Sequence, residues 1–130
     1  MSLVITSTVC SGVVIVEISG RLRFLEVGLR ERLNELLKEG HRAFVLNMAD
    51  VAYVDSFGLG QLVTIWSSVR NKGGQMILLR PTDHLLALLQ ITKLNTIFRI
   101  SENEAQAISS ARSNGFESIA HLVPTNSSMP

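Results

Sequence analysis

The stretch Val51-Ala52-Tyr53-Val54-Asp55-Ser56-Phe57-Gly58-Leu59-Gly60 decides the fold of this chain. It starts with apolar residues, typical of the end of a strand or an edge turn, and then turns sharply into a helix. Asp55 and Ser56 are the two polar residues at this junction, and either side chain can accept a hydrogen bond from an N–H of the first helical turn. Apolar residues then recur with the spacing of a helix that buries one stripe, at Leu59, Leu62, Val63, Trp66 and Val69.

Ser56 is expected on a surface turn, at the positive end of the helix dipole. A phosphate there would meet free N–H groups and a favourable field, although the ordinary role of such a serine is to cap the helix. A catalytic role is disfavoured because a serine nucleophile needs a base, and the spacing connects none of the three histidines to Ser56. The sequence also contains no Gly-x-Ser-x-Gly elbow and no phosphate-binding P-loop, so we do not expect an enzyme.

The composition indicates one soluble domain. The chain has 130 residues, of which 46% are apolar, and its formal net charge is +1. The basic residues are scattered, which argues against direct nucleic-acid binding. Cys10 is the single cysteine, so we expect no disulfide within the chain and no Cys-based metal site. We also expect no other metal and no cofactor. We see neither a signal peptide nor an apolar run long enough for a membrane span, and therefore expect a cytoplasmic protein.

Strand and helix patterns alternate along the chain. The first two strand patterns are close enough in sequence to form a hairpin, whereas helices separate the later strands and therefore predict parallel pairing. The expected strands are 3–7, 13–18, 43–48, 75–79 and 97–100. The expected helices are 25–38, 56–71, 82–92 and 102–112, the last with Ser101 and Glu104 as a capping box. Gly28 weakens the first of these helices, and could instead mark its true start or a close packing contact.

Four segments resemble one family. Asp55 to Gly60 resembles the Asp-Ser-Ser/Thr-Gly-Leu-Gly signature of STAS domains of the anti-sigma-factor antagonist class. Residues 43–51 are similar to that family's apolar strand and Asn-Leu-x-x-Val motif, residues 72–79 to its Gly-Gly turn and strand, and residues 88–94 to its third helix. The resemblance implies an α/β STAS fold with a mixed, mostly parallel sheet of about five strands and about four helices.

The resemblance covers roughly residues 3–112. We therefore expect a STAS domain at 1–112 and a C-terminal extension at 113–130 that includes a partly flexible tail.

The resemblance also implies a phosphorylation switch at Ser56. In such a switch, the unphosphorylated protein binds an anti-sigma factor with GHKL-type serine kinase activity and thereby releases a sigma factor. The kinase then phosphorylates the serine, the complex dissociates, and a PP2C-type phosphatase resets the cycle. The expected partner-binding residues in the signature are Asp55, Ser56, Phe57, Gly58 and Leu59.

Two departures from the family pattern bear on the partner. Phe57 replaces the usual second hydroxyl residue, and could either anchor a partner or pack back onto the domain. Arg21 and Arg23 stand where many members have an acidic Gly-x-Leu-Asp segment, on a loop expected at the same rim as Ser56. The two arginines could hold a phosphate on Ser56, select an acidic partner or serve as solvated surface.

Two other functions remain open from the sequence. The domain could be a scaffold subunit of a signalling or transport complex in which Ser56 only caps the helix. It could also be a sensor of a small ligand, which a thermal shift on adding nucleotide would reveal.

Overall fold

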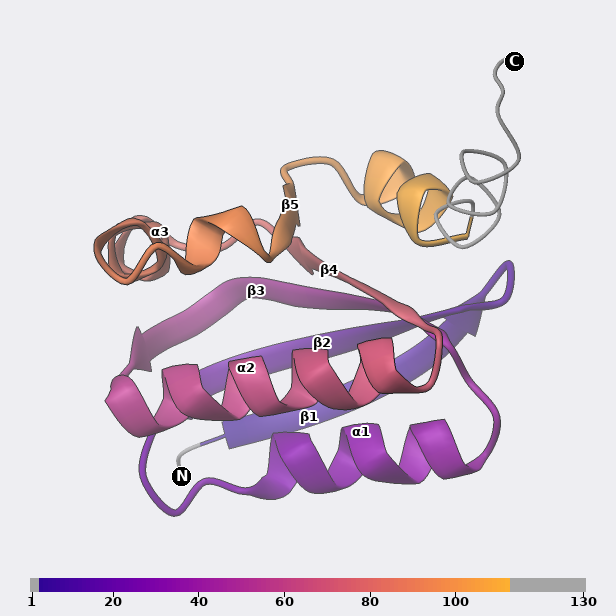
Figure 1. The fold of residues 1–130 in the computed structure, drawn as a ribbon, viewed down its shortest axis with the longest axis horizontal. Coiled ribbons are helices and arrows are strands. Elements are labelled where there is room, and N and C mark those ends of the chain that lie inside the picture. The colour runs from indigo at the N-terminus through magenta and orange to yellow at the C-terminus, as the bar shows by residue number, and fades with distance from the viewer. Residues whose placement is uncertain (1–2, 113–130) are drawn as a thin grey trace.

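The computed structural model describes residues 3–112, which form a five-stranded sheet with helices on both faces (Figure 1). The elements in chain order are β1 Leu3–Cys10, β2 Val13–Leu22, α1 Gly28–Lys38, β3 Ala43–Val54, α2 Ser56–Asn71, β4 Gln75–Leu79, α3 Asp83–Ile91, the short 3-10 helix η1 Leu94–Thr96 and β5 Arg99–Ser101. A last helical segment occupies 104–112.

The sheet has the strand order β1-β2-β3-β4-β5. β1 is antiparallel to β2, and every later pair is parallel. The hairpin turn between β1 and β2 has positive φ angles at Ser11 (56°) and Gly12 (82°), which suits the right-handed twist of the two strands. The predicted fold class, a mixed and mostly parallel sheet, is confirmed.

The two faces of the sheet carry separate apolar cores. Alternate residues of β2, such as Val14 and Val16, join the larger core with α1, α2 and α3. The intervening Val13 and Ile15 pack on the opposite face with Ala107 and Ala111 of the last helical segment. Burial on both faces explains the nearly continuous apolar run of β2. Figure 1 shows α1 and α2 lying side by side along one face.

β2 and β3 are longer than the sequence pattern predicts. The register between them shifts twice, between Glu17 and Ser19 and again between Gly20 and Arg21. Such bulges accommodate extra residues in a strand and bend it, so the apolar alternation that marks a strand is lost there. Because Leu22 pairs with Val54, the loop after β2 and the start of α2 lie at the same end of the sheet.

The structure decides the starts of two helices. α1 begins at Gly28, which is one of the alternatives that the sequence left open, and not at Leu25. Leu25 has a φ of 74°, outside the helical region, and is 76% exposed. The last helical segment is capped by Asn103, whose Oδ1 accepts a hydrogen bond from the N–H of Gln106 at 2.9 Å. Ser101 instead belongs to β5, so the predicted capping box is wrong.

The predicted extension 113–130 lies outside the described residues. Within the part of the chain that is described, no helix has the length and apolar character needed to cross a membrane.

Candidate functional site

Asp55 fixes the junction between β3 and α2. It has extended backbone angles (φ −95°, ψ −177°), and its Oδ1 accepts a hydrogen bond from the N–H of Gly58 at 2.8 Å. Its Oδ2 accepts a second bond, at 3.1 Å, from the N–H of Phe24 in the loop after β2. One carboxylate therefore caps the helix and also holds the neighbouring loop.

Ser56 is the first residue of α2 and not its cap. The prediction that Ser56 caps the helix is wrong, because the chain is still extended at Asp55 and the carboxylate of Asp55 reaches the N–H three residues ahead. The Ser56 side chain is exposed, and its hydroxyl makes no hydrogen bond with any described residue. The structure thus leaves this hydroxyl accessible at the tip of the turn.

The pKa of Asp55 is lowered from its ordinary value of 3.8, mainly because the Gly58 N–H donates to the carboxylate. Partial burial opposes this effect, whereas the N–H groups of Phe24 and Phe57 and the positive charge of Arg23 also lower the pKa. Hydrogen bonds to the ionised form favour that form, so the charged carboxylate is the state that holds the turn together.

We expect Asp55 to make the fold sensitive to acid. Because its pKa is lower in the folded state, its stabilising contribution is present above the unfolded value of 3.8 and is lost as the pH falls through the folded pKa. Asp55→Asn retains a capping side chain but removes the charge. Urea unfolding midpoints of the parent and this variant should differ at neutral pH and converge in acid. A difference that stays constant down to the lowest pH would contradict this account.

Gly58 and Leu59 support the turn from inside. Both are buried, and a Cβ built on Gly58 would lie 2.0 Å from the carbonyl oxygen of Leu22. The N–H of Leu59 donates to the backbone oxygen of Asp55 at 2.8 Å, as the first turn of the helix requires. Of the five expected signature residues, Ser56 and Phe57 are the exposed ones.

Phe57 packs against Phe24 at the rim. Their ring centroids are 4.6 Å apart at an interplanar angle of 49°, yet the two residues remain 58% and 57% exposed. Phe57 thus contacts its own domain and still presents an apolar surface. Leu25, also exposed, follows Phe24 in the same loop.

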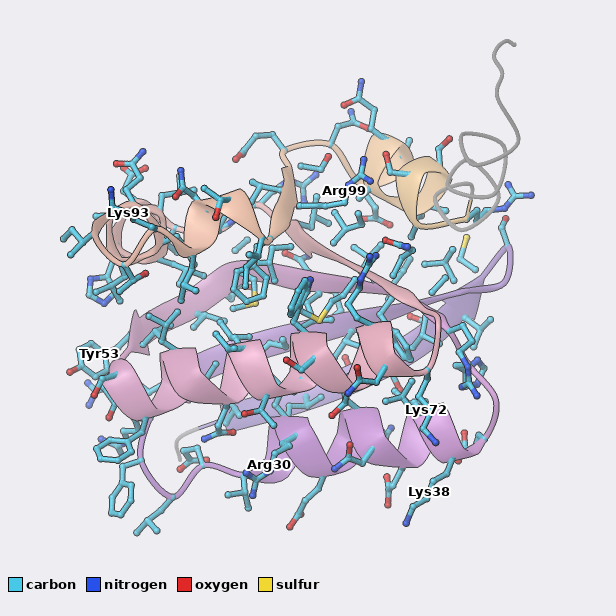
Figure 2. All side chains as sticks on the ribbon, in the orientation of Figure 1. Arg30, Lys38, Tyr53, Lys72, Lys93 and Arg99 are labelled. Carbon is cyan, nitrogen blue, oxygen red and sulfur yellow. The ribbon has the colours of Figure 1, made fainter. Side chains whose placement is uncertain are left out.

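A cavity of about 380 Å³ opens beside Ser56, between the loop after β2 and the first turns of α1 and α2. It is lined by Phe24, Leu25, Val27, Arg30, Ser56, Phe57, Gly60, Gln61 and Thr64. Arg30 carries the only charge among these lining residues. Gln61 is buried, and its Oε1 has no hydrogen-bond partner within the described part of the chain. Figure 2 shows Arg30 on the early part of α1, the helix that runs alongside α2.

The two arginines expected at this rim lie in different places. Arg23 is in the loop, where its charge acts on Asp55. Arg21 pairs with Tyr53 in the sheet and alternates with Leu22, which is buried in the core under α1 and α2. Arg21 is therefore on the opposite face from the cavity, and it is not among the cavity's lining residues.

The sequence did not identify Phe24, Arg30 and Gln61 as residues of this site. The connection of the strands could have indicated the first two. In a βαβ unit the loop after one strand lies beside the loop after its parallel neighbour, which brings 23–30 next to 55–61. Gln61 gave no such signal, since a glutamine one position outside the apolar stripe resembles solvated surface.

The search for a metal site in the described part of the chain gives a negative result. Across 3–112 no group of three His, Cys, Asp or Glu residues is placed to hold a metal ion. His84 lies near this end of the sheet, but its Nε2 is 3.2 Å from the oxygen of Val54 and its ring stacks on Tyr53. What the site offers is an accessible hydroxyl flanked by exposed aromatic rings.

Comparison with known proteins places this arrangement in a family. The family model described as STAS domain matches residues 5–107. The anti-sigma-B factor antagonist of Bacillus subtilis is 37% identical over 73 residues, which is 56% of this chain and 66% of that protein.

Solved structures show the same fold. The NMR structure of the Thermotoga maritima protein TM1081 has a TM-score of 0.73 at 28% identity and covers 82% of this chain and 86% of that one. The Bacillus protein SpoIIAA matches in its unphosphorylated form, with a TM-score of 0.66, 19% identity and coverage of 84% of this chain and 98% of that one. Its phosphorylated form gives 0.65 at 20% identity, covering 82% and 97%. The family model, the five-stranded mixed sheet and these relatives together show that the chain belongs to the STAS domain family, among proteins named as anti-sigma factor antagonists.

Proposed function

We propose that this protein is an anti-sigma-factor antagonist controlled by phosphorylation of Ser56. The unmodified protein binds an anti-sigma factor in the cytoplasm and frees a sigma factor, and phosphorylation ends that binding. The observation that carries the proposal is the position of Ser56: an exposed hydroxyl at the first residue of α2, in a turn that the Asp55 carboxylate fixes through the N–H of Gly58. The anti-sigma-B factor antagonist of Bacillus subtilis and the phosphorylated form of SpoIIAA support it.

The proposed chemistry takes place on a kinase and not on this chain. The kinase, an anti-sigma factor of the GHKL type, transfers the γ-phosphoryl group of ATP to Ser56 Oγ. The new O–P bond forms as the bond to ADP breaks, and the serine proton is released. A PP2C-type phosphatase returns the serine by hydrolysis. The contribution of this domain is to present the hydroxyl at the tip of a rigid turn.

The phosphate is proposed to act on the partner and not on the fold. It adds about −1.5 to −2 charges at neutral pH. Because Ser56 is exposed, the isolated domain can hydrate this charge. A partner pressed against the turn would have to desolvate it, and any carboxylate or apolar group of the partner there would add to the cost.

The exposed pair Phe24 and Phe57 is proposed as the apolar anchor for the partner. Buried aromatic anchors often contribute 2 kcal/mol or more, so we expect Phe57→Ala to weaken partner binding by roughly 30-fold or more. Titration calorimetry with the anti-sigma factor measures this effect. Val9→Ala is the matched control, because Val9 is equally exposed but lies at the hairpin, away from Ser56. Equal losses in the two variants would rule out a specific anchor.

The proposal is tested by incubating the protein with serine kinases from its own genome, ATP and Mg²⁺, followed by intact-mass measurement and site mapping. We expect a single phosphate on Ser56 and none on the Ser56→Ala variant. The half-buried Ser67 and Ser68 on α2 are internal controls. Phosphate at those serines, or none with any candidate kinase, would count against the proposed switch.

A further inference from the structure

We propose that Arg30 holds the phosphate once Ser56 is phosphorylated, by turning its guanidinium into the cavity between α1 and α2. This inference rests on the proposed function, since it concerns the phosphorylated state of the same serine. It assigns the phosphate a specific partner within the chain, on a different helix from the serine.

The first argument is that the helix terminus is already occupied. A phosphate at a helix N-terminus is usually held by free N–H groups. Here the Asp55 carboxylate accepts from Gly58 at 2.8 Å and also attracts the N–H of Phe57. A phosphate on Ser56 would therefore meet N–H groups that are already engaged, next to another negative charge. Beyond hydration, the group of this chain that can add a compensating positive charge is therefore a side chain.

The second argument is the location of Arg30. It lies on α1, and its side chain lines the same cavity of about 380 Å³ as Ser56. Arg30 is exposed and forms no ion pair or hydrogen bond with other described residues. Arg32, two residues later on the same helix, instead donates a hydrogen bond to Ser7 and forms an ion pair with Glu35. An arginine with no other partner can reorient at little cost, and its planar donors match two phosphate oxygens at once.

The third argument is a buried acceptor without a partner on Gln61, a residue that lines the cavity. Gln61 is 9% exposed, and its Oε1 has no hydrogen-bond partner among the described residues. A buried acceptor without a donor is costly, and a guanidinium carries five N–H donors. If Arg30 enters the cavity, it can donate to the phosphate with some of these groups. A rotation of the Gln61 side chain toward the cavity would let another of them satisfy Oε1. The Phe24 and Phe57 rings on the same wall add favourable contacts for a cation.

Arg23 is the other cation near the turn, but it is less suited to this role. Its charge already acts on Asp55, and it is not among the residues that line the cavity. The remaining charged group in the same loop, Glu26, would repel a phosphate. The geometry therefore favours Arg30, which the spacing of the sequence did not single out.

The test uses full-length protein in which phosphoserine is installed at position 56 during synthesis, so that no kinase is needed. A phosphorus NMR titration then gives the pH at which the phosphate loses its second proton, which is about 6 without a partner. An arginine in contact favours the dianion. We expect this transition in the parent at a pH about one unit lower than in Arg30→Gln. Arg30→Lys should keep most of the effect, because it retains the charge.

The control is Arg32→Gln, which removes the same charge from the same helix at a residue that lines a different cavity. This variant should titrate like the parent. The inference fails if Arg30→Gln leaves the titration unchanged, or if Arg32→Gln moves it equally. Because the phosphoserine is built in, a failure here is independent of whether a kinase modifies Ser56 in the kinase assay, and the two results separate the two proposals.

Discussion

Gly58→Ala should destabilise this domain by about 1–3 kcal/mol or more. This is the largest loss that we expect from adding a single methyl group at any of the described glycines. The new Cβ would lie 2.0 Å from the carbonyl oxygen and 2.7 Å from the carbonyl carbon of Leu22. Both atoms are backbone and cannot move aside as the end of a side chain can. The first turn of α2 would have to separate from β2, which also disturbs the hydrogen bonds of Asp55.

Gly60→Ala is the matched control. It adds the same methyl group two residues later in the same helix, where a Cβ meets no atom within 4 Å. Alanine is the better helix former, so this variant should be more stable than the parent by roughly 0.5–1 kcal/mol. Urea unfolding of the two variants and the parent gives both values. Losses of equal size at the two positions would show that close packing on Leu22 is not what requires glycine at position 58.

A negative charge at Ser56 should have the largest effect on binding. We expect phosphorylation to lower the affinity for the anti-sigma factor about 100-fold, which corresponds to about 2.7 kcal/mol. Ser56→Asp, with a single charge, should lower it at least about tenfold. Ser56→Ala should bind like the parent and be nearly as stable, because Asp55 and not Ser56 caps the helix.

These affinities can be measured by titration calorimetry at two salt concentrations. The loss for Ser56→Asp should shrink at higher salt if part of it is charge repulsion. Equal affinities for Ser56→Ala and Ser56→Asp would contradict the electrostatic account. Circular dichroism of both variants shows whether the fold is intact before the affinities are compared.

The fold could be predicted from the sequence because the strand patterns, the helix patterns and the connections between them all indicated the same architecture. Apolar runs of the right length alternated with amphipathic helices, and the order of the strands followed from the connections between them. The β4 boundaries, Gln75–Leu79, were predicted correctly for this reason. The ends of β2 and β3 were not, because bulges near Gly20 interrupt the period-two pattern on which strand prediction depends.

The site was predictable in its position but not in its detail. The signature identified the turn, yet two adjacent capping residues, Asp55 and Ser56, are equivalent in sequence. Only the backbone conformation decides between them. Likewise, Arg21 and Arg23 are two residues apart and look alike in a loop. A strand that extends to Leu22 sends Arg21 to the far face of the sheet and leaves Arg23 beside Asp55.

The contribution of α1 to the site depends on tertiary contacts. Arg30 lies 26 positions before Ser56 in the chain, and no local pattern links them. The packing of α1 alongside α2 brings both residues to one cavity. The place of Arg30 beside Ser56 therefore follows from the structure and not from the sequence pattern.

The central claim is that Ser56 controls the exchange of partners, and a competition measurement tests it most directly. The complex of the sigma factor with its anti-sigma factor is titrated with unmodified protein or with protein carrying phosphoserine at position 56, and released sigma factor is measured. The account predicts release by the unmodified protein and about a 100-fold higher concentration requirement for the phosphorylated form. Equal release by both forms, or no release by the unmodified protein, would contradict it.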